Sequence, residues 1–88
     1  MKPNALLIDS RDDVVTVLQA VLMGEPVHWT NGDSILARED IPVGHKVAIR
    51  SIDRGAAIRK YGWPIGMARV AIVPGDRVHT QHLSAVEE

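Results

Sequence analysis

Two short polar triplets carry the side chains best suited to acid–base and anion-binding chemistry. Gly44-His45-Lys46 precedes an apolar run, and Lys60-Tyr61-Gly62 falls within a turn-rich segment. An imidazole titrates near neutral pH and can donate or accept a proton. An ammonium holds a carboxylate or sulfonate as a point charge. His45 could therefore serve as a proton donor, a proton acceptor or a ligand, and Lys60 could hold a small acid. The alternatives are a surface histidine beside a loop glycine and a solvated lysine.

Two of the three aromatic residues lie in one turn. Tyr61 and Trp63 stand two positions apart beside Pro64, and Trp29 is the only other aromatic residue. Tyrosine and tryptophan combine apolar area with a polar tip and are enriched at interfaces. This turn predicts a binding or subunit-contact surface. The alternative is that both rings only cap a small core.

The remaining ionisable residues give weaker signals. His79 and His82 are three positions apart, a spacing that sends them to opposite faces of a strand. No complete metal site is therefore expected within this chain. His28 is expected to be structural or exposed, and Asp12 and Asp13 are expected in a solvated turn or a helix cap.

Composition limits the class of protein. The 88 residues allow one domain, and without phenylalanine its core must be aliphatic. So thin a core is compatible with an oligomer. Ten basic and eleven acidic residues nearly cancel, which disfavours nucleic-acid binding through a broad positive field. Cysteine is absent. The apolar run near the start is too short for a signal peptide or a membrane span, so no membrane association and a cytoplasmic location are expected.

Glycine corners indicate many short strands. An apolar residue, two others, glycine, two others and a second apolar residue occur around Gly24, Gly55 and Gly75, as tight turns between strands require. Asn31-Gly32 predicts a two-residue hairpin loop. Strands are expected in 47–52, 65–73 and 77–83. The valine-rich run 14–22 favours a strand over a capped helix. Together these patterns predict a compact all-β domain with little helix.

Several motifs in order resemble a known family. They are Glu-Asp-Ile-Pro-Val-Gly-His-Lys at 39–46, Lys-Tyr-Gly at 60–62 with Ile65-Gly66, and Gly-Asp-Arg-Val-His at 75–79. These segments resemble the small subunit of the altronate dehydratase family, from about residue 12 to residue 83. The resemblance implies that residues 1–88 form a single SAF domain, a mostly β arrangement called a β-clip.

The resemblance also implies an activity and a site. It implies a lyase that removes water from a sugar acid such as altronate or galactarate, with a divalent metal, often iron, held mainly by a large dehydratase subunit. This chain would be a non-autonomous subunit, inactive alone. Carried over by position, His45 and His79 would be catalytic residues, and Lys46, Lys60 and Tyr61 would bind substrate. The tail departs from the family, with Gln81 where histidine is usual and His82 where asparagine is usual.

Two other functions remain open at this stage. The chain also resembles the small subunit of sulfolactate sulfo-lyase, which eliminates sulfite from a related acid. It could instead be a SAF module without catalysis, either a binding module or a domain that only supports a large subunit. A neighbouring reading frame for a large dehydratase-type subunit would favour the lyase.

Overall fold

The chain is built of short antiparallel strands. The computed structural model describes residues 2–30, 32–78 and 83–84, and within them it contains nine strands and no helix. The expectation of an all-β domain is confirmed. No helix in the described part is long and apolar enough to cross a membrane. The strands are β1 (Ala5–Leu6), β2 (Val14–Val17), β3 (Pro26–His28), β4 (Ser34–Leu36), β5 (Lys46–Ala48), β6 (Ala57–Lys60), β7 (Trp63–Ala68), β8 (Arg77–Val78) and β9 (Leu83–Ser84).

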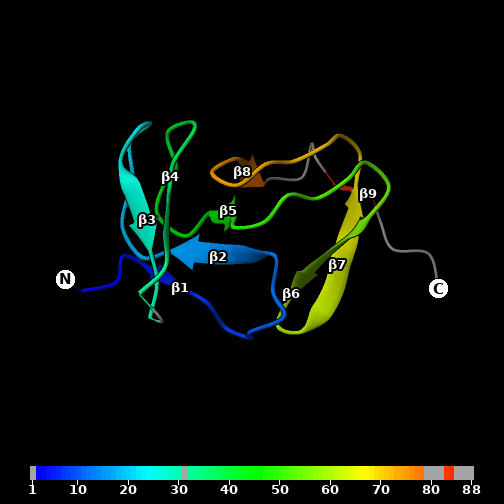
Figure 1. Cartoon of the computed structure of the whole chain (residues 1–88), viewed down its shortest axis with the longest axis horizontal. Helices are drawn as coiled ribbons and strands as arrows, with labels where there is room; N and C mark the ends of the chain where they lie inside the picture. The colour runs from blue at the N-terminus through cyan, green and yellow to red at the C-terminus, as the bar shows by residue number, and fades with distance from the viewer. Residues whose placement is uncertain (1, 31, 79–82, 85–88) are drawn as a thin grey trace.

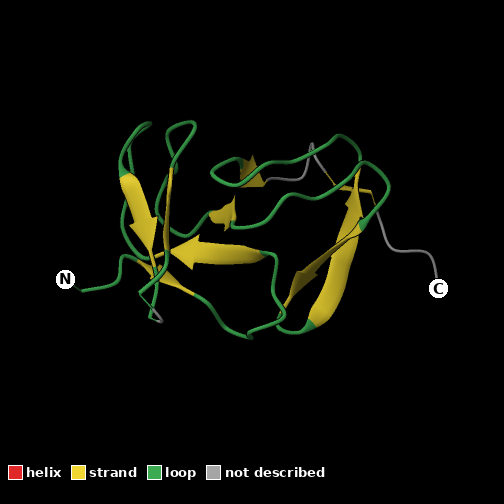
Figure 2. Ribbon diagram, viewed as in Figure 1, coloured by secondary structure: helices red, strands yellow, loops and turns green. Residues whose placement is uncertain are grey.

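A central sheet lies between two hairpins. Its strand order is β1-β2-β5-β8, and all its pairings are antiparallel. The β3–β4 hairpin lies at one end of the molecule, and β6 and β7, with β9 beside β7, lie at the other (Figure 1). Figure 2 shows that long loops connect these short strands. The turns, rather than long strands, therefore fix where the side chains lie.

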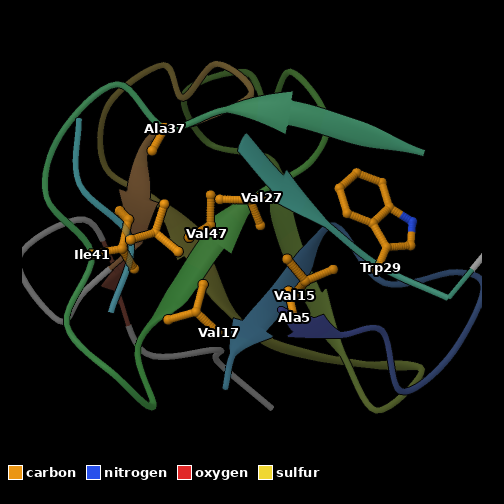
Figure 3. Close-up of a cluster of buried hydrophobic side chains, with 9 residues drawn as sticks. Ala5, Val15, Val17, Val27, Trp29, Ala37, Ile41 and Val47 are labelled. Carbon is orange, nitrogen blue, oxygen red and sulfur yellow. The ribbon is translucent and has the colours of Figure 1, made fainter. Parts of the chain in front are cut away.

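Strand β2 separates two hydrophobic clusters. Its side chains alternate between the two faces of the sheet, as in any strand. Val15 and Val17 pack with Val47 in one cluster, which Figure 3 shows with the indole of Trp29 at one end. Val14 packs with Ala48 in the other cluster. A strand buried on both faces explains why valine occupies three of its four positions, and the helix alternative for this segment is wrong.

The second half of the fold repeats the first. Two isolated antiparallel bridges, Val21 with Ile41 and Ile52 with Ile72, are related by a shift of 31 positions, from 21 to 52 and from 41 to 72. The surrounding backbone hydrogen bonds repeat with the same shift. The N–H of Gly24 donates to Ala37 and that of Gly55 to Ala68, while that of Gly44 donates to Val17 and that of Gly75 to Ala48. The fold is thus an internal duplication.

The duplication adds a fourth glycine corner to the three found by sequence pattern. Ile41, Gly44 and Val47 follow the same spacing, and all four corner glycines have positive φ, from 83° to 97°. The corners seemed unequally spaced because two of them belong to each half. Positive φ is inexpensive only for glycine, which explains why this residue recurs.

Some predicted boundaries differ from the structure. In the first hairpin Val27 pairs with Ile35, and the Trp29 N–H donates to the Asp33 carbonyl. Asn31 of the predicted two-residue loop lies outside the described residues. The strand expected in 47–52 ends at Ala48, and the one expected in 65–73 begins at Trp63 and ends at Ala68. Most of the last predicted strand lies at 79–82, outside the described residues.

Candidate functional site

Three polar side chains extend one face of the second hydrophobic cluster. On β2 and β5, Val14 lies opposite Ala48, and two positions along each strand Thr16 lies opposite Lys46. On β6, Ile58 belongs to the same cluster, and Lys60 follows it by two positions. Alternation along each strand therefore brings Thr16, Lys46 and Lys60 to the same border of this cluster.

Lys60 is a buried ammonium. Only 4% of the residue is exposed, and its Nζ donates a hydrogen bond of 2.8 Å to Oγ1 of Thr16. The same nitrogen lies 4.4 Å from the centre of the Tyr61 ring, a distance at which the ring attracts a cation. No ion pair found among the described residues involves Lys60 or Lys46. Burial, and then the nearby positive charge of Lys46, lower the pKa of Lys60, while Asp12 acts in the opposite direction.

A tight turn fixes the position of Lys60. Lys60 pairs with Trp63 across the β6–β7 hairpin, and the two loop residues, Tyr61 and Gly62, have φ of 58° and 74°. Positive φ at both positions is the mark of a type I′ turn, for which asparagine followed by glycine is preferred. Tyr61 is the only residue other than glycine with positive φ in the described part of the chain, so its conformation is strained.

Asp12 holds this turn. Its carboxylate is fully buried and accepts backbone hydrogen bonds from Gly62 at 2.8 Å, Tyr61 at 3.0 Å and Asp9 at 3.2 Å. Asp13 binds the same hairpin one residue before Lys60, since its carboxylate accepts a hydrogen bond of 2.9 Å from the Arg59 N–H. The expectation that Asp12 lies in a solvated turn or a helix cap is wrong.

The structure brings together part of the predicted site. Lys46, Lys60 and Tyr61 lie around Thr16, as the hydrogen bond, the ring contact and the strand register show. His45 is exposed and lies one residue before β5, where its carbonyl accepts a hydrogen bond from the Val17 N–H. His79 lies outside the described residues, as do Gln81 and His82.

Two residues, Asp12 and Thr16, were not assigned to the site from the sequence. Asp12 was missed because its role depends on a turn 49 and 50 positions away. The sequence does contain a signal for Thr16, because Thr16 is the one polar residue in the run Val14–Val17. A single hydroxyl in a strand buried on both faces requires a polar partner, and Lys60 is that partner.

Metal ligands do not assemble in this part of the chain. No group of three or more histidine, aspartate or glutamate side chains in residues 2–30, 32–78 and 83–84 could hold a metal ion. The buried carboxylate of Asp12 is already engaged by backbone N–H groups. The described residues therefore do not fit the divalent metal that the resemblance implies.

A hollow of about 520 Å³ lies at the other hairpin. Its lining includes Pro26, His28, Trp29 and Ser34 and none of the predicted site residues. By the shift of 31 positions, Trp29 is the counterpart of Lys60. An acidic ligand needs a cationic partner when it leaves water. The candidate site is therefore the border of the second cluster where Thr16, Lys46 and Lys60 lie, rather than this mostly apolar hollow.

Comparisons with known proteins show the family of this chain. Residues 3–86 match the family described as Altronate/galactarate dehydratase SAF domain. The chain belongs to this family. It is 39% identical over 75 residues to altronate dehydratase from Bacillus subtilis (strain 168) and 36% identical over 75 residues to altronate dehydratase from Escherichia coli (strain K12). Each alignment covers 85% of this chain but 15% of the relative.

A relative of similar size is also found. Subunit alpha of (2R)-sulfolactate sulfo-lyase from Paracoccus pantotrophus is 38% identical over 48 residues, which cover 54% of this chain and 72% of that subunit. Segments similar to this chain therefore occur both within long dehydratases and in a short lyase subunit. The relatives are lyases, which gives this SAF domain a lyase context.

Proposed function

We propose that this SAF domain is the small subunit of a sugar-acid hydro-lyase of the altronate or galactarate dehydratase type. It contributes substrate-binding residues to an active site that a large subunit completes. The observation that supports this most directly is the buried Lys60, which has Lys46 nearby and no ion pair with a described carboxylate. Two cations without a counterion favour an anionic ligand.

In this proposal the lysines bind and orient the acid. Lys60 and Lys46 hold the substrate carboxylate, and the ring of Tyr61 keeps the ammonium of Lys60 in place. Dehydration requires a base that removes the proton next to the carboxylate. His45 or His79 would supply this base. In this proposal the large subunit supplies most of the ligands of a divalent metal, and no group of three or more candidate ligands lies among the described residues of this chain.

Reconstitution with a large dehydratase subunit tests the proposal. The full chain should show no turnover of altronate or galactarate alone and should become active with its partner. In that pair, His45→Ala and His79→Ala should each lower kcat/KM at least tenfold, about 1.4 kcal/mol in barrier. His28→Ala, on the remote hairpin, is the matched control. If both variants and Lys60→Met keep full rates, the domain only supports the large subunit.

A sulfo-lyase is the second candidate. The alignment covers 72% of subunit alpha of sulfolactate sulfo-lyase, compared with 15% of either altronate dehydratase. A sulfonate is also an oxyanion that an ammonium can hold. Release of sulfite from sulfolactate by the reconstituted pair, with no dehydration of altronate or galactarate, would favour this function.

A further inference from the structure

The Lys60–Thr16 pair has hydrogen-bond donors to spare. An ammonium carries three N–H donors, and the described hydrogen bond uses one of them, to Thr16. Because the threonine oxygen accepts this bond, its own O–H proton is left to donate. Both groups point to the same border of the cluster, so their unused donors favour one ligand with several acceptor oxygens.

The surrounding charge favours an anion. Lys46 faces Thr16 across the β2–β5 pair, and it is close enough to disfavour a second positive charge on Lys60. The carboxylate that acts on Lys60 most strongly, Asp12, is occupied by three backbone N–H groups of the chain. A ligand that brings negative charge would relieve the repulsion between the lysines and strengthen each hydrogen bond.

Access is available from the surface. Thr16 and Lys46 are half-buried rather than enclosed, and Tyr61, whose ring contacts Lys60, is 57% exposed as a residue. A small ligand can therefore reach the pair without disruption of the core. Thr16, Lys46, Lys60 and Tyr61 all belong to this chain, so the site needs no residue from a partner.

We propose that Thr16, Lys46 and Lys60 form an oxyanion-binding site that is complete within this chain and takes a carboxylate or sulfonate group in the absence of a partner subunit. This inference rests on the proposed function, because the same lysines would hold the acid in the assembled enzyme. It adds Thr16 to the residues that bind the acid. It also predicts that the acid binds to this chain without being turned over. An ammonium binds as a point charge without strict geometry, so both planar and tetrahedral oxyanions fit.

Titration of the isotopically labelled full chain tests this site. Glycolate, methanesulfonate and inorganic phosphate are added separately at constant ionic strength, and amide shifts are followed by NMR. We expect saturable binding of glycolate or methanesulfonate, with a dissociation constant on the order of 1 mM. The shifts should concentrate at residues 16, 46 and 60–62. Absence of saturation with all three probes, or shifts that do not concentrate at these residues, would overturn the proposal.

Matched variants assign the binding. Lys60→Met and Thr16→Val should each weaken it at least tenfold, whereas Arg54→Met, an exposed cation beyond the far end of β6, should leave it unchanged. Lys60→Met removes a buried charge, so it is expected to fold, and Lys60→Arg provides a second variant that keeps the charge. Unchanged binding in Lys60→Met would overturn the proposal.

The two proposals fail in different ways. If the isolated chain binds no oxyanion but Lys60→Met abolishes turnover in the reconstituted pair, the site needs the partner and only this inference is wrong. If the isolated chain binds glycolate through Lys60 but Lys60→Met leaves turnover unchanged, the site exists and the proposed function is wrong.

Discussion

Gly44 and Gly75 occupy equivalent corners of the duplicated fold, and only Gly75 is in close contact with the other half. Their φ angles are 83° and 97°. A Cβ at Gly44 would meet nothing within 4 Å, whereas a Cβ at Gly75 would overlap the Leu36 carbonyl oxygen and lie 2.9 Å from Cγ of Arg38. The N–H of Arg38 also donates to the Gly75 carbonyl at 2.9 Å. This corner therefore connects the two halves.

The two glycines provide a matched pair of stability variants. Gly44→Ala should lower the free energy of unfolding by about 1–2 kcal/mol, the cost of a left-handed backbone with a side chain. Gly75→Ala should lower it by more than about 3 kcal/mol, because backbone atoms must also move. Urea denaturation measures both. Equal losses in the free energy of unfolding would show that the contact with Leu36 does not contribute to the cost of Gly75→Ala.

Asp12→Ala should destabilise the fold by about 3 kcal/mol, because it leaves three backbone N–H groups without their acceptor in a buried turn. Asp53→Ala is the control: Asp53 lies on an exposed corner, and its removal should change stability by less than about 0.5 kcal/mol. Chemical denaturation of both variants measures these changes in the free energy of unfolding. A small effect at Asp12 would mean that water can replace the carboxylate.

Tyr61→Asn should stabilise the chain by about 1 kcal/mol, because asparagine tolerates positive φ in a type I′ turn. The same change removes the ring from Lys60 and should weaken substrate binding. Tyr61→Phe keeps both the strain and the ring, so its melting temperature should stay near that of the parent chain. If asparagine lowers the melting temperature, contacts of the ring outweigh the strain.

Stability should depend on pH through Lys60. Burial and Lys46 lower its pKa from the ordinary value near 10.5. Between the lowered pKa and the ordinary value, the unfolded chain binds more protons than the folded chain, so stability rises with pH across that window. Lys60→Met removes this dependence. Its stability relative to the parent should therefore be highest at neutral pH and should fall as the pH approaches 10.5.

The pH experiment has an internal control. Denaturation at pH 7 and near pH 10, in buffers free of carboxylates, is compared for the parent, Lys60→Met and Arg54→Met. The difference between the parent and Arg54→Met should be the same at both pH values, because Arg54 is exposed. A difference between the parent and Lys60→Met that does not change with pH would contradict the assignment of a lowered pKa.

Trp63→Ala should affect assembly rather than folding. The residue is 74% exposed, so truncation of its side chain should change stability by less than about 0.5 kcal/mol. An aromatic residue at the centre of an interface contributes strongly to binding, and we expect at least tenfold weaker association with the proposed large subunit. Leu22→Ala, also exposed, is the control in the same binding assay. Undiminished association would exclude Trp63 from the contact.

Local patterns predicted the fold better than they predicted the site. The glycine corners and the valines of β2 report on backbone conformation and burial nearby, so the all-β class followed from the sequence. The role of Asp12 depends on the turn at Tyr61 and Gly62, about 50 positions away. No local pattern carries such a contact. Thr16 and Lys46 likewise became neighbours only through the register of β2 with β5.

Strand β2 makes the two halves inseparable. Its last residue, Val17, pairs with Ala5 in the first half, and its first residue, Val14, pairs with Ala48 in the second. Neither half retains its hydrophobic cluster if this strand is lost, because Val15 and Val17 belong to one cluster and Val14 belongs to the other. The domain should therefore melt in one cooperative transition despite its duplicated design. A fragment that ends between the halves should not persist as a folded unit.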